Sequence, residues 1–301
     1  MYNIIGKSKI WLGISGFLVL TSIVFLAIWG FKLGIDFTGG SILEVSYSQQ
    51  RPTMEQVQNI LAPLELGSLK IQAGGENDYI LRFEEIEETT HQDILDNLSA
   101  IKVEGVEENQ LSESRFEAIG PAVGEELKTK AIQAIIIVLV FIVLYIAYAF
   151  RKVSKPVASW KYGLAAIVAL AHDILIVAGV FSALGYFMGV EIDTLFVTAL
   201  LTILGFSVHD TIVTFDRIRE NLFQTHDKEF KEIVNISINQ TITRSINTSF
   251  TTLLVLLAIY FFGGESIRYF SLALILGVIF GTYSSIFIAS PLLILWNKSK
   301  T

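Results

Sequence analysis

The chain has 301 residues, of which 52% are apolar and only 17% are charged, and its mean hydropathy is +0.57. A typical soluble protein carries about 25% charged residues, so this composition excludes a soluble domain of this length. The chain has no cysteine, which excludes disulfide and thiol chemistry, and no basic patch interleaved with aromatic residues, so we expect no nucleic-acid binding.

Charge is distributed unevenly along the chain. Residues 31–130 hold 19 acidic and 8 basic side chains, a net charge of −11. The rest of the chain holds 10 acidic and 14 basic side chains, a net charge of +4. Such asymmetry indicates a protein whose parts face two different compartments.

Six stretches are long and apolar enough to cross a bilayer, since a helix needs about 20 mostly apolar residues to span the hydrocarbon core. They are residues 10–30, 131–150, 162–187, 192–215, 241–262 and 267–296. The first stretch is too long for the apolar region of a signal peptide, and no A-x-A-like cleavage site follows it. We therefore expect an uncleaved first span and an α-helical, polytopic membrane protein with six transmembrane helices.

Basic residues predict the orientation of these spans, because cytoplasmic flanks are enriched in Lys and Arg. The turns at residues 188–191 and 263–266 hold no basic residue, whereas all four segments on the other side do. Those basic residues are Lys7, Lys9, Arg151, Lys152, Lys155, Lys161, Arg217, Arg219, Lys228, Lys231, Lys298 and Lys300. We expect both termini in the cytoplasm and residues 31–130 outside it.

The segment between the first and second spans, residues 31–130, is long enough for one small domain. We expect strands over residues 41–48, 68–73, 79–83 and 113–119, and helices over residues 53–61 and 88–100. Gly74-Gly75-Glu76-Asn77 is a hairpin-turn signal between the two middle strands. The order βαββαβ predicts a small α+β domain of the ferredoxin-like type.

The remaining residues, 131–301, are expected to form a five-helix membrane domain with a cytoplasmic loop at residues 216–240. In that loop, apolar residues alternate with charged ones at near-helical spacing. This pattern predicts an amphipathic segment that lies along the membrane surface.

Two charged residues lie inside predicted spans, where a charge is costly and is by default a functional candidate with an expected partner. Asp210 lies one to two turns from the inner end of the fourth span, and Arg244 lies about one turn into the fifth. Because these spans run in opposite directions, both residues lie at a similar depth, and we expect them to pair. A carboxylate balanced between a nearby Arg and desolvation takes up and releases protons. The alternative is a structural ion pair with no transport role.

Polar residues accompany both charges at helical spacing. They are Ser207 and Thr214 beside Asp210, and Asn247, Thr248 and Thr251 beside Arg244. These side chains are candidates to line an ion path. The alternative is that they only form hydrogen bonds between packed helices.

A third polar site is the pair His172-Asp173, within the third span. It is either a structural hydrogen-bonding pair or part of an ion path. No further ligand lies near it in the sequence, so we expect no metal site and no cofactor. No nucleophile–base set is present either, so we do not expect an enzyme.

Gly34-Ile35-Asp36-Phe37-Thr38-Gly39-Gly40 joins the first span to the acidic domain. Gly39 and Gly40 permit a tight turn with positive φ. The alternative is an ordinary junction loop.

Several motifs resemble those of the SecF members of the SecD/SecF family, within the resistance-nodulation-division superfamily. They are GIDFTGG at 34–40, AIGPAVGEEL at 118–127, the His-Asp pair of the third span, GFSVHDTIVTFDRIREN at 205–221 and GTYSSIFIASPLL at 281–293. The resemblance covers essentially the whole chain in order. The residues that it identifies as family motifs are Gly34, Asp36, Gly39, Gly40, Asp216, Arg217 and Arg219.

This resemblance implies a subunit that uses the proton or sodium motive force to promote polypeptide translocation across the bacterial cytoplasmic membrane. Asp210 and Arg244 match the family's ion-coupling residues. The implied partners are SecD, the SecYEG translocon, YajC, an unfolded preprotein and membrane lipid. The family's second acid belongs to SecD, so this chain alone is not expected to conduct ions.

Two other functional classes remain open at this point. One is a half-unit of a small-molecule or lipid transporter of the same superfamily. The other is a non-conducting scaffold for a partner subunit, which predicts that Asp210 and Arg244 tolerate neutral replacement.

Overall fold

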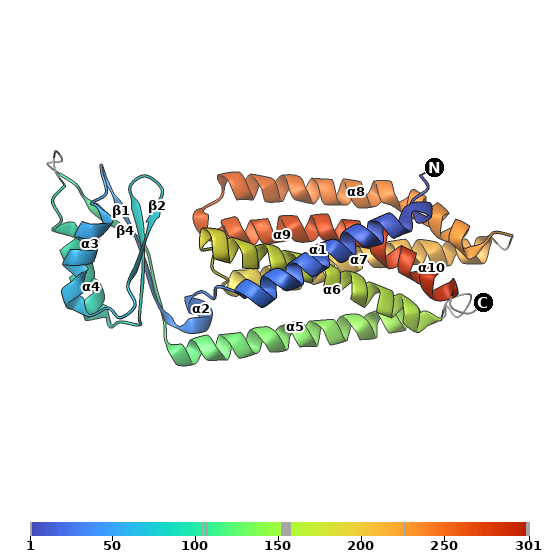
Figure 1. Cartoon of the computed structure of the whole chain (residues 1–301), viewed down its shortest axis with the longest axis horizontal. Helices are drawn as coiled ribbons and strands as arrows, with labels where there is room; N and C mark the ends of the chain where they lie inside the picture. Colours follow the sequence, from blue (N-terminus) through green and yellow to red (C-terminus); the bar gives the residue numbers. More distant parts are fainter. Residues whose placement is uncertain (1, 104, 106–107, 152–157, 226, 299–301) are drawn as a thin grey trace. The chain divides into compact units, whose positions relative to one another are not determined.

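The computed structural model describes residues 2–103, 105, 108–151, 158–225 and 227–298 (Figure 1). It divides into two compact units, an α+β unit of Leu33–Ala131 and a helical membrane unit of Met1–Lys32 with Ile132–Thr301. Three of the basic residues that predict orientation, Lys152, Lys155 and Lys300, lie outside the described residues.

Within the described residues, six helical stretches are long and apolar enough to cross a bilayer, which confirms the predicted spans. They are α1 (Ser8–Trp29), α5 (Pro121–Ala149), α6 (Ser159–Met188), α7 (Thr194–Gln224), α8 (Phe230–Phe262) and a sixth that begins as α9 (Glu265–Ser284). The sixth continues through the π-helical turn η3 (Ser285–Ala289) into α10 (Ser290–Lys298). A short 3-10 turn, η1 (Ile5–Lys7), precedes α1.

The six spans are buried to very different extents. About 61% of the most apolar window is buried in α6 and in the sixth span and 50% in α7, against 11% in α1 and α8 and 6% in α5. The centre of the membrane unit is therefore formed by α6, α7 and α9. The other three spans turn most of their apolar surface away from this chain, toward lipid or another protein.

The sequence predicted that residues 216–240 form an amphipathic segment along the membrane surface, and this prediction is wrong. Helix α7 continues to Gln224 and α8 already begins at Phe230, so this stretch consists of the packed ends of two spans. Its apolar residues join a buried cluster that contains Phe215, Ile218, Val234 and Ile238. The sequence pattern misled because near-helical spacing of apolar residues suits burial against a neighbouring helix as well as burial in a membrane surface.

The α+β unit has the predicted βαββαβ order. Its elements are the single turn α2 (Ile35–Thr38), β1 (Gly40–Tyr47), α3 (Met54–Leu61), η2 (Ala62–Leu64), β2 (Lys70–Gly74), β3 (Asp78–Phe83), α4 (Glu88–Ser99) and β4 (Leu111–Ile119). The sheet order is β2-β3-β1-β4, and each neighbouring pair is antiparallel. This arrangement confirms the ferredoxin-like pattern, with α3 and α4 together on one side of the sheet (Figure 1).

Buried and partly exposed residues alternate along the central strands β1 and β3. Because successive side chains of a strand point to opposite faces, this alternation places one face of the sheet in the core of the α+β unit. Leu43, Val45 and Tyr47 of β1 are buried with Leu81 of β3 against the two helices. A capping box at Thr53 starts α3, and Gly75 makes the predicted hairpin turn with a φ of +59°.

Gly179 of α6 marks a close approach of α1. A Cβ atom at this position would lie 2.4 Å from Cβ and 2.6 Å from Cα of Ser22. We expect Gly179→Ala to lower the free energy of unfolding by about 1–3 kcal/mol, because backbone has to move to admit the methyl group. Thermal unfolding of the purified protein measures this effect.

Gly163→Ala is the matched control on the same helix, since a Cβ there would meet Ile146 at an ordinary 3.8 Å. Equal melting temperatures for the two variants would contradict the close approach of α1 and α6.

Candidate functional site

Asp210 of α7 is held by hydroxyl groups from two other helices. Ser245 of α8 donates from Oγ to Oδ1 at 2.5 Å, and Ser285, the first residue of η3, donates to Oδ2. The carboxyl group is half-buried, whereas both serines are buried. One acid therefore joins three spans through hydrogen bonds to its two oxygens.

Arg244 shares a small cavity with Asp210. The cavity has a volume of about 20 Å³, enough for a single water molecule, and His209 and Thr248 also line it. The predicted direct ion pair is not formed, since no ion pair within the described parts of the chain engages Arg244. The reason is helical geometry: Ser245 faces α7, and Arg244, about 100° away around α8, approaches the cavity from the exposed side.

The polar residues predicted to follow Arg244 lie on the exposed side of α8. Asn247, Thr248 and Thr251 are all exposed, and of these Thr248 lines the cavity. Arg244 is exposed with them, so α8 presents a polar strip that this chain leaves uncovered. Polar and charged side chains at membrane depth normally face protein or water rather than lipid.

The predicted His172-Asp173 pair is a second buried site, on α6. Asp173 is fully buried, and His172 Nδ1 lies 2.9 Å from its Oδ1 atom. The other oxygen, Oδ2, accepts hydrogen bonds from Ser207 of α7 at 2.6 Å and from Ser284 of α9 at 2.8 Å. Ser207, predicted to accompany Asp210, thus binds a different acid.

Sequence reasoning missed three of the four serine partners of the two acids. Thr214, which it selected, donates to the backbone carbonyl of Asp210 instead. The missed residues are Ser245, Ser284 and Ser285. One signal was available: serines within an apolar span are enriched where helices pack.

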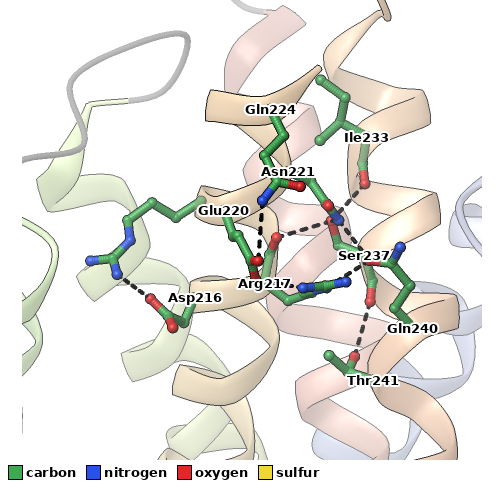
Figure 2. A network of polar contacts seen from close by, with 10 residues as sticks. Asp216, Arg217, Glu220, Asn221, Gln224, Ile233, Ser237, Gln240 and Thr241 are labelled. Atoms are coloured by element: carbon green, nitrogen blue, oxygen red, sulfur yellow. Dashed lines mark hydrogen bonds and ion pairs between the residues drawn. The ribbon is translucent and has the colours of Figure 1, made fainter.

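The family-motif residues at the end of α7 hold that helix against α8 (Figure 2). Arg217 Nε donates to Oε1 of Gln240 at 2.7 Å, and Asn221 Nδ2 donates to Ser237 Oγ and to the same Gln240 oxygen, each at 2.8 Å. Figure 2 shows these side chains pointing toward one another across the two helices. The network fixes how α7 and α8 meet about two to three turns beyond Asp210.

Two ion pairs near the same end of α7 join residues within that helix. Arg219 forms an ion pair with Asp216, and Arg217 forms one with Glu220, both at i,i+3 spacing. These groups are partly exposed to solvent, where such pairs contribute little stability.

The glycine motif of the α+β unit forms a tight turn. Gly34 precedes the single turn α2, and Gly39 and Gly40 have φ values of +75° and +122°, which confirms the predicted positive φ. A Cβ atom on Gly39 would lie 2.8 Å from Cα of Pro121, at the start of α5. Asp36 is half-buried within the turn. The motif therefore brings the start of β1 against the start of α5.

Comparison with known proteins identifies relatives along the whole chain. The family profile described as "Protein export membrane protein SecD/SecF, C-terminal" matches residues 99–299, and the "SecD/SecF GG Motif" matches residues 24–50. A protein translocase subunit SecF from Thermobaculum terrenum is 43% identical over 93% of this chain and 89% of its own length. Another, from Anaerolinea thermophila, is 37% identical over 100% of this chain and 96% of its own length.

Solved structures give the same result. The crystal structure of SecDF from Thermus thermophilus, a translocon-associated membrane protein, matches with a TM-score of 0.83 and 32% identity over 99% of this chain. SecDF in its super-membrane-facing form matches with a TM-score of 0.70 and 33% identity. The present chain corresponds to 39% of the length of each SecDF chain.

Proposed function

The chain belongs to the SecD/SecF family of protein export membrane proteins, as a SecF-type subunit, and from this premise we propose that it couples ion movement to polypeptide translocation. The driving force in this proposal is the proton or sodium motive force, and Asp210 is the residue that binds the ion. The observation that carries the proposal is the position of Asp210, where one carboxylate holds α7, α8 and the sixth span together.

Protonation of Asp210 changes these contacts for a simple chemical reason. The ionised carboxylate accepts hydrogen bonds at both oxygens, whereas the acid form has a proton of its own to donate. The hydroxyl groups of Ser245 and Ser285 then reorient or separate from it. Binding and release of one proton thereby alter how α8 and the sixth span pack on α7.

Arg244 supplies the second half of the site in this proposal. It holds a positive charge beside the cavity that Asp210 lines. Asn247 and Thr251 continue its exposed strip along α8, and we assign this strip to contact with SecD. In this assignment an acid of SecD faces Arg244, so that the ion path is complete only in the heterocomplex.

The remaining assignments follow from the family. The SecYEG translocon, YajC, an unfolded preprotein and membrane lipid are the other proposed partners. The protein is a transport component of the bacterial cytoplasmic membrane, with both termini in the cytoplasm and residues 31–130 outside it. Basic residues on one side of the spans and net negative charge in residues 31–130 support this orientation.

Ion flux in proteoliposomes tests the proposal. The chain is co-purified with SecD, reconstituted, and exposed to a proton gradient or a sodium gradient of equal size. We expect flux of one of the two ions through the heterocomplex and none through this chain alone, because the second acid is missing from it. Absence of flux of either ion through the assembled heterocomplex would overturn ion coupling.

A further inference from the structure

Two adjacent serines of the sixth span bind two different acids, the fully buried Asp173 and the half-buried Asp210. Ser284, the last residue of α9, donates to Asp173 Oδ2 at 2.8 Å, and Ser285, the first residue of η3, donates to Asp210 Oδ2. Both serines are fully buried. The acids belong to different helices, α6 and α7, so a single peptide link in the sixth span connects the two sites.

The π-helical turn is where this double contact occurs. Adjacent residues of an α-helix point about 100° apart, which lets one helix reach two neighbours. Residues 285–289 then form a π turn, and the Ser290 hydroxyl donates to the Ser285 carbonyl five residues earlier at 3.2 Å. A π turn has a looser hydrogen-bond pattern than an α-helix and is frequent at functional sites.

A second link between the acids runs through α7. Ser207 donates to the same Asp173 oxygen at 2.6 Å and lies three residues before Asp210 on the same helix. Both α7 and the sixth span therefore touch both acids. A rearrangement at one acid displaces an element that also holds the other.

The Asp173 site has an open position for a proton. When His172 Nδ1 donates to Asp173, its Nε2 atom carries a lone pair, and Nε2 is buried with no hydrogen-bond partner among the described residues. The ring of Tyr283 on α9 lies near this imidazole, with centroids 6.1 Å apart. At the other acid, the titratable or charged groups that line the cavity are His209 of α7 and Arg244 of α8.

We propose that Ser284 and Ser285 are positioning residues that couple proton binding at Asp210 to proton binding at the His172–Asp173 pair. A proton taken up by either acid turns an acceptor into a donor and reorients the serine bound to it. The neighbouring serine, one residue away in the same turn, then changes its own contact. This inference rests on the proposed function and adds a second, coupled proton site within the same chain.

The test uses the heterocomplex with SecD in proteoliposomes, with ion flux measured as a function of pH. Ser285→Ala removes a donor to Asp210, and a hydrogen bond to a charged group is worth roughly one pH unit, so the pH of half-maximal flux should rise by about that amount. Ser284→Ala removes a donor to Asp173 only, and through the coupling it should also raise this pH. The double variant should shift it by less than the sum of the single shifts.

Ser271→Ala is the matched control. Ser271 is also fully buried on α9, but among the described residues its hydroxyl bonds only to the Ile267 carbonyl of its own helix, so the pH profile should not move. Ser284→Thr is a second variant for the case in which Ser284→Ala assembles poorly. It retains the hydroxyl and should keep the wild-type pH profile.

The outcomes separate this inference from the proposed function. An unchanged pH profile in Ser284→Ala beside a shifted one in Ser285→Ala would overturn the coupling and leave Asp210 as the only proton site. Exactly additive shifts in the double variant would overturn it as well. Normal flux in Asp210→Asn would instead overturn the proposed function itself.

Discussion

Asp210→Asn is expected to reduce ion flux and ion-driven translocation to the level of protein-free vesicles. Asparagine has nearly the shape of aspartate, but it neither binds nor releases a proton near neutral pH. Its amide oxygen still accepts one of the two serine hydrogen bonds, so the packing of α7, α8 and the sixth span should persist. The variant should therefore co-purify with SecD in normal amounts and fail only in coupling.

Reconstituted flux and secretion of a preprotein measure this loss, each normalised to the amount of assembled complex. Asp227→Asn is a suitable control, because it removes one negative charge from an exposed position between α7 and α8. Full proton-driven secretion by the Asp210 variant would contradict the proposed coupling and favour a non-conducting scaffold.

Arg244→Met is expected to have an effect on flux close to that of Asp210→Asn. Methionine keeps much of the aliphatic bulk of arginine but removes the charge beside the Asp210 cavity. The structure also predicts the effect of this substitution on stability, which the sequence alone did not. Because no ion pair within the described residues engages Arg244, its loss should change the free energy of unfolding of this chain by no more than about 0.5 kcal/mol.

Thermal unfolding and flux measured on the same preparation separate these two effects. Arg268→Met serves as control, since Arg268 is an exposed arginine of α9 that lies over the Tyr260 ring, and it does not line the cavity. Normal flux in Arg244→Met, or a large loss of stability, would indicate a structural charge rather than a coupling residue.

The membrane spans and the α+β unit could be predicted from the sequence because both depend on local patterns. A run of about 20 apolar residues suffices to identify a span, as in α1 and α6. Alternation of buried residues in β1 and the turn at Gly75 likewise follow from neighbouring residues. Asp210 and Arg244 were selected for the same reason, since a charge within an apolar run is visible without any knowledge of packing.

The partners of those charges were decided only by the tertiary structure. Depth in the bilayer follows from position in the sequence, but the direction of a side chain depends on the rotation of its helix and on which neighbour it meets. Thus Ser245, rather than Arg244, binds Asp210, and Ser207 binds Asp173 on another helix. Residues 216–240 became helix ends because their apolar side chains found a neighbouring helix to pack against. Local pattern determined what lies in the membrane, and helix packing determined which of its polar groups meet.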